Sequence, residues 1–512
     1  MFPATIPLLP VLFVTLALPI TVLFLKRKHH DRSLPPGPPA FPVFGNLPML
    51  LGKFPHRTLQ AMAQKYGPIM SLRLGQIPAL IVSNSEAAEM FLKTHDASFA
   101  SRRKTQASEY VSYGSKGLLF SEYGTYWRNM KRLCTSQLLS ASKVSSFAGV
   151  REREVEATVK SIKRAAARGE AVNITEAVNH LVEDTTYKIV MGRSRDNEVD
   201  LTALVHDAIS VSGAFNIADY VPWLGSFDLL LGSTRRLKKI AKAVDQVLEK
   251  IIEEHHTRGS GSGACHASRD HRDFIDILLS LMNQPVDPRD EQSQVMDRTN
   301  VKAILLDTIA GSFETSATVI VWVLSELLKH PRVMRNLQDE LANLVGLNKF
   351  VQETHLTNLS YLDIVIKETL RLHPAGAFFP RETIKDTMVN GYHIREKTII
   401  IINLWALGRD PKAWSNNANE FYPERFLTKN FDYRGYSFQF IPFGSGSRGC
   451  PGIHLGLTMV KLIVAQLVHC FTWELPSNMT PDELDMNEKF ALTLTKAKNL
   501  HAVPTYRLLC EV

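Results

Sequence analysis

The stretch Phe443-Gly-Ser-Gly-Ser-Arg-Gly-Cys-Pro-Gly452 decides how this chain of 512 residues is interpreted. It places Cys450 seven residues after an aromatic residue and two residues after Arg448, with glycines at the bends. A thiolate is a soft ligand that suits iron, and glycines let the backbone curl tightly around the sulfur. Residues 453–460 have helical character, so we expect Cys450 near a helix N-terminus, where the helix dipole favours a thiolate. The stretch therefore predicts a cysteine-ligated iron centre.

An unreactive cysteine buried in a glycine-rich loop is the alternative, but five specified positions within ten residues rarely arise by chance. The loop resembles the haem-thiolate loop of the cytochrome P-450 superfamily. The resemblance implies haem b (iron protoporphyrin IX) ligated by Cys450, with Arg448 reaching a haem propionate and Phe443 covering the sulfur. Gly446 and Gly452 would allow the tight bends. A haem iron held by cysteine is electron-rich enough to favour cleavage of the O–O bond.

The composition is that of an ordinary globular protein, large enough for one big domain or for two to three smaller ones. Hydrophobic residues make up 45% of the chain, and 59 basic residues against 51 acidic ones give a net charge of +8. This excess suits an acidic partner or an anionic membrane surface. No zinc-finger spacing, helix-turn-helix signal or basic stripe with interleaved aromatics indicates nucleic-acid binding. The five irregularly spaced cysteines exclude a disulfide scaffold and fit a reducing compartment.

The N-terminal stretch of the chain, residues 2–25, contains no charged residue. As a helix it would be about 36 Å long, which is enough to span a bilayer. The basic cluster at 26–28 follows at once and places the rest of the chain on the cytoplasmic side. A cleaved signal peptide is the alternative, disfavoured by the length and by the lack of a small-residue cleavage site. We therefore predict a membrane anchor at 1–25, a basic and proline-rich hinge at 26–39, and one catalytic domain at 40–512.

Hydrophobic periodicity predicts a mainly α-helical body with small β-sheets. Helical periodicity dominates from about residue 119 to 375. Alternating or β-branched apolar runs predict strands at 69–74, 79–83 and 398–403. The resemblance implies the cytochrome P-450 fold, in which haem lies between two long helices.

The pair Glu368 and Arg371 lies three residues apart, close enough to form an ion pair on one helix face. Such pairs are common on surface helices and mean little alone. Here the pair precedes Pro423-Glu-Arg-Phe426. In the family these motifs form a buried network of three charges behind the haem, which the resemblance assigns to Glu368, Arg371 and Arg425.

Gly311 and Thr315 lie four residues apart in a long apolar helical stretch, so they share a helix face. The resemblance implies that Gly311 leaves room for dioxygen above the iron. Thr315 would hold a proton-donating water, with Glu314 as the acid beside it. The alternative is a helix with ordinary polar residues.

Further residues are assigned by the resemblance to the haem and to the substrate. In Trp127-Arg-Asn-Met-Lys-Arg132, Trp127 and Lys131 would hold a propionate, and Arg381 would be another propionate partner. The alternative is a basic, solvated helix face, which could present Arg128 and Arg132 to an acidic electron donor. The predicted apolar lining of the substrate pocket comprises Ile304, Phe378, Phe379 and Leu492.

These motifs occur in the family's order across residues 35–452 and resemble the microsomal plant type of secondary metabolism. The resemblance implies a monooxygenase that hydroxylates a small apolar metabolite, either a terpenoid or a phenolic, biphenyl or flavonoid compound, at the endoplasmic reticulum membrane. No nucleotide or flavin motif is present, so electrons are expected from an NADPH-dependent cytochrome reductase, with cytochrome b5 as a further donor. Three alternatives remain: a haem-thiolate lyase or isomerase acting on a hydroperoxide, a non-catalytic haem-binding protein, and an anchored scaffold without haem.

Overall fold

The computed structural model describes residues 34–52, 54–195, 201–260, 272–285, 295–429 and 431–509. The predicted anchor and residues 26–33 of the predicted hinge lie outside these ranges. The helices are α2 (Leu47–Leu50), α3 (Pro55–Tyr66), α4 (Ser85–Glu89), α5 (Gln106–Tyr110), α6 (Thr125–Gln137), α7 (Ala141–Ser146), α8 (Ala148–Ala167), α9 (Ile174–Met191), α10 (Leu201–Ser212), α11 (Ile217–Tyr220), α12 (Gly225–Leu230), α13 (Ser233–Ser260), α14 (Phe274–Ser280), α15 (Arg298–Lys329), α16 (Pro331–Val345), α17 (Ser360–Leu372), α18 (Leu404–Leu407), α19 (Pro411–Trp414), α20 (Arg425–Thr428) and α21 (Ile453–Cys470). The strands are β1 (Ile69–Leu74), β2 (Ile77–Val82), β3 (Val172–Asn173), β4 (Phe378–Glu382), β5 (Thr387–Val389), β6 (Tyr392–Ile394), β7 (Ile399–Asn403), β8 (Phe471–Glu474), β9 (Glu488–Phe490), β10 (Leu494–Lys496) and β11 (His501–Tyr506).

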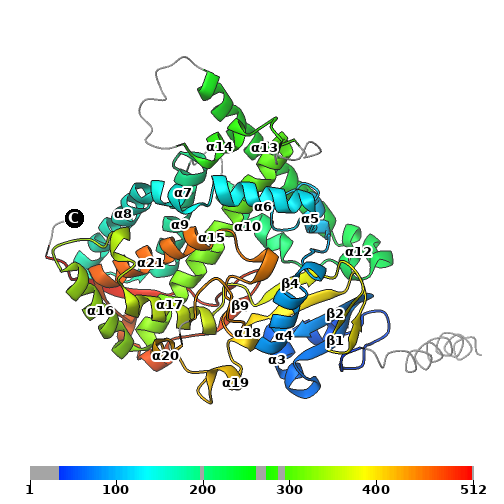
Figure 1. Cartoon of the computed structure of the whole chain (residues 1–512). Helices are drawn as coiled ribbons and strands as arrows, with labels where there is room; N and C mark the ends of the chain where they lie inside the picture. Colours follow the sequence, from blue (N-terminus) through cyan, green and yellow to red (C-terminus); the bar gives the residue numbers. More distant parts are fainter. Residues whose placement is uncertain are drawn as a thin grey trace, which may run out of the picture.

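The largest sheet has the strand order β1-β2-β7-β4 and lies at one end of the molecule, while α8, α16 and α21 lie at the other (Figure 1). β2 and β7 are parallel, with Ala79 opposite Ile399, and the other pairings are antiparallel. The strands predicted at 69–74, 79–83 and 398–403 are β1, β2 and β7, so these predictions are confirmed. Most residues of β7 are buried, which explains its continuous run of isoleucines.

The helix α15 runs through the middle of the helical part and contacts α9 on one side and α21 on another. It begins at a capping box, in which Asp297 accepts from the Asn300 backbone N–H at 2.7 Å. Buried side chains lie all around its second half, as expected for a helix that packs on every side. By length and composition α15, α21 and the Leu201–Tyr220 stretch could each cross a membrane, and in α15 and α21 core packing accounts for the apolar sequence. α15 carries the predicted site residues Gly311, Glu314 and Thr315, and α21 begins just after Cys450.

The described part of the predicted hinge is hydrogen-bonded to strand β1 of the sheet. The Ser71 backbone N–H donates to the Pro36 carbonyl at 2.9 Å, and the Ser71 hydroxyl donates to the Pro35 carbonyl at 2.7 Å. A Cβ on Gly37 would lie 2.0 Å from the Ser71 carbonyl oxygen, so only glycine permits this approach. Residues 35–37 are therefore held against β1.

Candidate functional site

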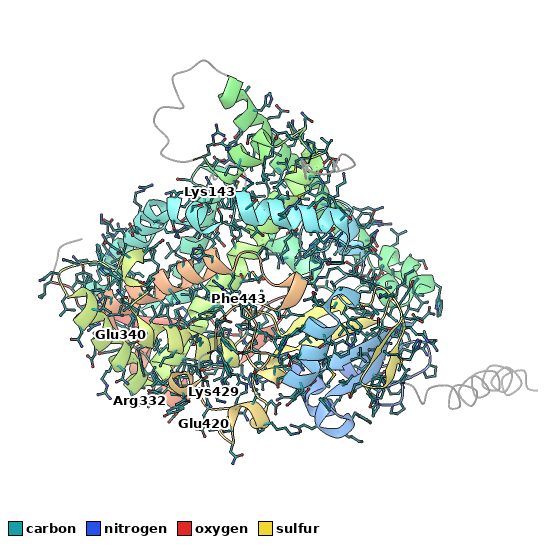
Figure 2. All side chains as sticks on the ribbon, in the orientation of Figure 1. Lys143, Arg332, Glu340, Glu420, Lys429 and Phe443 are labelled. Carbon is teal, nitrogen blue, oxygen red and sulfur yellow. The ribbon has the colours of Figure 1, made fainter. Side chains whose placement is uncertain are left out.

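The cysteine-containing loop is a tight turn that ends at the start of α21. The Cys450 backbone N–H donates to the Phe443 carbonyl at 2.9 Å and closes the loop. Figure 2 shows Phe443 near the middle of the view, well inside the outline of the molecule. Gly446 has a φ of +66°, and a Cβ there would lie 2.4 Å from a carboxylate oxygen of Asp96. Gly446 is thus required both by backbone conformation and by space.

The other predicted glycine, Gly452, has a different role from the expected one. Its φ of −89° is open to any residue, so the bend expected there does not depend on glycine. The second glycine of the loop with a left-handed backbone is instead Gly444, which has a φ of +75°. A Cβ added there would lie 3.1 Å from the Phe379 ring. The Gly452 backbone N–H donates to the sulfur of Cys450.

Cys450 combines an accessible side chain with a position deep in the protein. Its residue surface is exposed, yet burial raises the pKa of its thiol. The Gly452 N–H and the positive charge of Lys131 act in the opposite direction. The expected stabilisation of a thiolate is therefore present, but burial outweighs it for the free thiol. A metal cation at the sulfur would reverse this balance.

Trp127, Lys131 and Arg448 come together around this loop. The Arg448 guanidinium lies 3.9 Å from the centroid of the Trp127 ring and donates to the Ala100 carbonyl at 2.7 Å. The Lys131 ammonium donates to the carbonyls of Ser447 and Gly449. Lys131 thus holds the loop itself in this structure, in addition to lying beside Trp127.

A cluster of cations extends from Arg448 to Arg381 and Arg102, the last of which the sequence analysis missed. Burial, followed by the charges of Arg102 and Arg381, lowers the pKa of Arg448 to about 9. Burial also lowers the pKa of Arg381 to about 10, and only Asp96, with an oxygen 3.6 Å from Arg381 Nη1, opposes this shift. Nη1 of Arg381 and Nε of Arg102 have no hydrogen-bond partner within the described ranges. Such a set fits a buried ligand with carboxylates, as haem propionates would supply.

Gly311, Glu314 and Thr315 lie together on α15. Gly311 is exposed although its helix is largely buried, and a Cβ there would meet no described atom within 4 Å. The Thr315 hydroxyl donates to the Gly311 carbonyl at 2.6 Å. Glu314 Oε2 is buried, and the described part of the chain offers it no hydrogen-bond partner. The helix therefore has open space beside Gly311, with a hydroxyl and an unsatisfied carboxyl group next to it.

The structure brings Glu368, Arg371 and Arg425 into one buried network. Arg371 donates to both carboxylate oxygens of Glu368 at 2.7 and 2.8 Å, and Arg425 Nε donates to Oε1 at 2.9 Å. Glu368 is fully buried, and Arg371 also donates to three backbone carbonyls. The network ties α17 to the segment before α20, because the Tyr422 backbone N–H donates to the same carboxylate.

The four residues predicted to line the substrate pocket differ in burial and in the side chains around them. Ile304 is only 1% exposed and packs within a core cluster. Phe378 packs edge-on against Phe490 at 5.7 Å, whereas Phe379, next along β4, faces the cysteine loop at Gly444. Leu492 is exposed, at the turn between β9 and β10.

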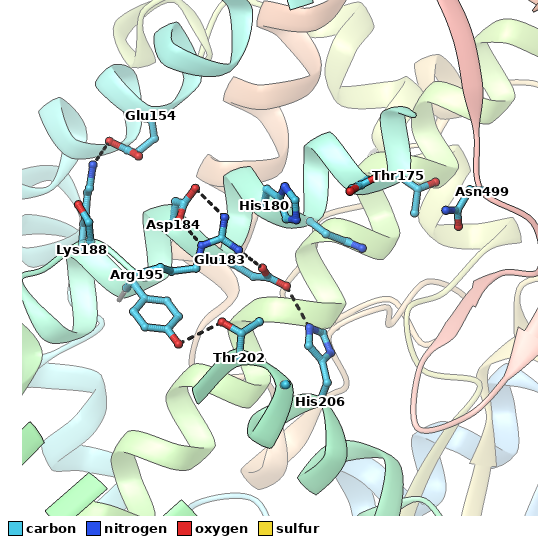
Figure 3. Close-up of a pocket in the computed structure, with 15 residues that line it drawn as sticks. Glu154, Thr175, His180, Glu183, Asp184, Lys188, Arg195, Thr202, His206 and Asn499 are labelled. Carbon is cyan, nitrogen blue, oxygen red and sulfur yellow. Dashed lines mark hydrogen bonds and ion pairs between the residues drawn. The ribbon is translucent and has the colours of Figure 1, made fainter. Parts of the chain in front are cut away.

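A separate cleft lies between α9 and α10, and Figure 3 shows its lining. Glu183 is bound there by Arg195 at 2.9 Å and by His206 at 3.0 Å, and Asp184 also pairs with Arg195. None of its lining residues belongs to the predicted site. Its charged lining residues are four carboxylates, Glu154, Glu176, Glu183 and Asp184, against Lys188 and Arg195, so the cleft lacks the surplus positive charge found near Cys450.

Comparisons with known proteins agree with this geometry. The cytochrome P-450 family model matches residues 35–502. The chain is 49% identical to cytochrome P-450 CYP736A12 of Panax ginseng, over 99% of this chain and 100% of the relative. It is 37% identical to desmethyl-deoxy-podophyllotoxin synthase of Sinopodophyllum hexandrum, over 96% of each chain, and 38% identical to costunolide synthase of Cichorium intybus, over 93% of each. This protein therefore belongs to the cytochrome P-450 family, as a haem-containing monooxygenase of plant type.

Proposed function

We propose that the enzyme hydroxylates a small apolar plant metabolite of terpenoid or phenolic type at a haem ligated by Cys450. The exposed residue Cys450 in the loop of Arg448, together with the incompletely paired Arg102 and Arg381, is the observation that carries the proposal. Haem with a thiolate ligand supplies the activation of dioxygen. The relatives named for the synthesis of costunolide and of desmethyl-deoxy-podophyllotoxin support a plant metabolite as substrate.

The cation cluster would hold the haem carboxylates. Arg381 and Arg102 have N–H groups left to donate, and Arg448 lies against Trp127 beside them. Hydrogen bonds between ionised partners are roughly twice as strong as neutral ones. Burial, and after it the repulsion among these arginines, lowers the pKa of Arg448 and Arg102, and each carboxylate would relieve that repulsion. Binding is thus favoured by new hydrogen bonds and by charge neutralisation.

Thr315 and Glu314 would hold and relay protons on the side of α15 that Gly311 leaves open. In its present orientation the Thr315 hydroxyl donates to the Gly311 carbonyl, which leaves its oxygen free to accept from a water molecule. Glu314, with a buried oxygen that has no described partner, is the nearby proton source. Gly311 keeps space open beside them, because any side chain would extend into that space.

Electrons would come from an NADPH-dependent cytochrome reductase, with cytochrome b5 as a further donor. Arg128 and Arg132 are exposed on α6, the helix whose Lys131 contacts the cysteine loop, and they offer positive charge to an acidic partner. Residues 1–25 would anchor the protein in the endoplasmic reticulum membrane with the catalytic domain facing the cytoplasm.

The test is reconstitution of the full-length protein in microsomes with a plant reductase, against a panel of terpenes and phenolics read by mass spectrometry. We expect NADPH-dependent gain of one oxygen atom in at least one compound. Turnover of a fatty-acid hydroperoxide without NADPH would instead establish the lyase or isomerase alternative. Carbon monoxide binding without NADPH consumption across the panel would indicate a non-catalytic haem protein.

A further inference from the structure

Asp307 on α15 binds the backbone of a segment that is far away in the sequence. Its Oδ2 accepts from the backbone N–H of Leu118 at 2.6 Å and from that of Leu119 at 2.9 Å. Asp307 lies one helical turn before Gly311, so it shares the face of α15 that carries the oxygen-side residues. One carboxylate oxygen therefore joins this face to residues 118 and 119.

Gly117 makes this contact possible. A Cβ on Gly117 would lie 2.1 Å from Asp307 Oδ2, closer than any two such atoms can approach. The carboxylate occupies the space that a side chain at position 117 would fill. Gly117 and Asp307 thus form a matched pair in which one residue must be small so that the other can bind.

Leu118 is held on its opposite side by residues of the cation cluster. Its carbonyl accepts from Trp127 Nε1 at 3.0 Å and from Arg448 Nη1 at 3.3 Å. Arg448 also donates to the Ser121 carbonyl, three residues further along. Asp307 and Arg448 therefore bind opposite ends of the peptide group between Leu118 and Leu119, and their opposite charges polarise that group in the same direction.

We propose that Asp307 is a positioning residue: it latches residues 117–119 to α15 and so fixes the Leu118 carbonyl that orients Trp127 and Arg448. The latch deepens the proposed function, because its effect on haem depends on the proposed role of Trp127 and Arg448. The contact itself is independent of that role and can be measured separately.

Few titratable groups face the carboxyl group of Asp307. Burial raises the pKa of Asp307 to about 6, while the N–H groups of Leu119 and Leu118 act to lower it. The titratable groups that face it are Tyr126 and Cys134 of α6. Burial raises the pKa of both, that of Cys134 to about 12, so both stay neutral near pH 7. The groups of residues 117–119 that face the Asp307 carboxylate are backbone N–H groups. Asp307 is therefore ionised at pH 7.5 and largely protonated at pH 5.

Hydrogen exchange of the holoenzyme, followed by mass spectrometry on a peptide covering residues 117–120, measures the latch directly. Asp307→Ala should speed exchange roughly 10- to 100-fold at pH 7.5, because hydrogen bonds to a charged acceptor are lost. Asp307→Asn keeps an oxygen acceptor without the charge and should restore most of the protection. The ratio of protection between wild type and Asp307→Asn should approach one at pH 5. Thr308→Ala is the control, since its hydroxyl donates to the Ile304 carbonyl of its own helix.

Gly117→Ala provides a second, independent variant. The added Cβ should displace the carboxylate and reproduce the fast exchange of Asp307→Ala. In the Asp307→Ala background the space is vacant, so Gly117→Ala should add little, and the two effects should be strongly non-additive. Additive effects, or unchanged exchange at residues 117–120 in Asp307→Ala, would overturn the latch.

The rate of haem loss to a large excess of apomyoglobin separates the latch from the proposed function. Faster exchange together with roughly tenfold faster haem loss in Asp307→Ala supports both. Faster exchange with unchanged haem loss leaves the latch standing and shows that haem retention does not depend on how the Leu118 carbonyl is held.

Discussion

Arg102 and Arg381 are two like charges held close together inside the protein. Burial, and then the positive charge of Arg381, lower the pKa of Arg102 to about 9. Arg102 donates to the Pro380 carbonyl, which immediately precedes Arg381 in β4. An arrangement that the polypeptide alone destabilises is explained if a bound anion completes it. The pair therefore supports the proposed anion site, in addition to holding the carbonyls of Pro380 and Ser445.

Replacing one of these arginines should weaken haem binding. Arg102→Gln removes one charge-assisted hydrogen bond, worth about 1.5–3 kcal/mol, so haem loss should be roughly 10- to 100-fold faster. Haem transfer to apomyoglobin measures this rate. Lys104→Gln is the matched control, because Lys104 is an exposed residue two positions away that pairs with Glu122. Equal rates of haem loss in both variants would remove Arg102 from the site.

Cys450→Ser should abolish the absorbance of the reduced carbon monoxide complex that is typical of thiolate ligation. Cys134→Ala is the control, because Cys134 is also a free cysteine but is buried in α6. Its spectrum should match that of wild type. If Cys450→Ser kept the thiolate-type band, the iron ligand would have to lie elsewhere.

Thr315→Ala should retain haem but divert electrons from product to peroxide, because the hydroxyl that organises proton delivery is lost. Ser312→Ala is a close control: the Ser312 hydroxyl donates to the Thr308 carbonyl at 2.8 Å, the same kind of bond within the same helix. The measurement is product and peroxide formed per NADPH consumed. A similar loss of coupling in both variants would show that helix geometry, and not the threonine hydroxyl, is responsible.

The sequence predicted those parts of the site that are contiguous or periodic. The loop around Cys450 and the Gly311–Thr315 spacing each lie within one short segment, so local geometry was enough to place them. The strands β1, β2 and β7 could be predicted because their apolar runs are bounded by turn residues.

Contacts made through tertiary structure could not be predicted. Arg102 contacts a residue 278 positions away and Asp307 one 189 positions away, and no local pattern marks either one. Ile304 was predicted to line the pocket as an apolar residue, but the direction in which it faces from α15 is set by the packing of other helices around it.

Glu368→Gln should strongly destabilise the fold. The substitution keeps the shape of the side chain but leaves Arg371 and Arg425 as buried charges without a counter-charge. Breaking such a network costs about 3–5 kcal/mol, measured here as a shift of the denaturant midpoint. Glu89→Gln breaks the exposed pair with Lys93 and should cost about 1 kcal/mol or less. Similar effects of the two substitutions would show that burial does not set the strength of the network.

Stability should fall in acid because of Glu488, which ties β9 to α3. Burial alone would raise the pKa of Glu488, but hydrogen bonds from His56 and Arg57 lower it to about 2, against an ordinary value of 4.5. A carboxyl group with a lowered pKa in the folded state stabilises the fold above its ordinary pKa. That contribution, at most about 3 kcal/mol, is lost as the pH falls from 4.5 toward 2.

Urea unfolding of wild type and of Glu488→Gln at pH 7, 4.5 and 3 tests this expectation. The wild type should lose more stability between pH 4.5 and pH 3 than the variant, because the glutamine has no proton to gain. Glu474→Gln, at an exposed position in β8, should keep the wild-type dependence on pH. If Glu488→Gln and wild type showed the same loss between these two pH values, the acid sensitivity would arise from other carboxyl groups. In that case the 2.9 Å contact between Glu488 and His56 would hold β9 against α3 whether or not Glu488 is charged.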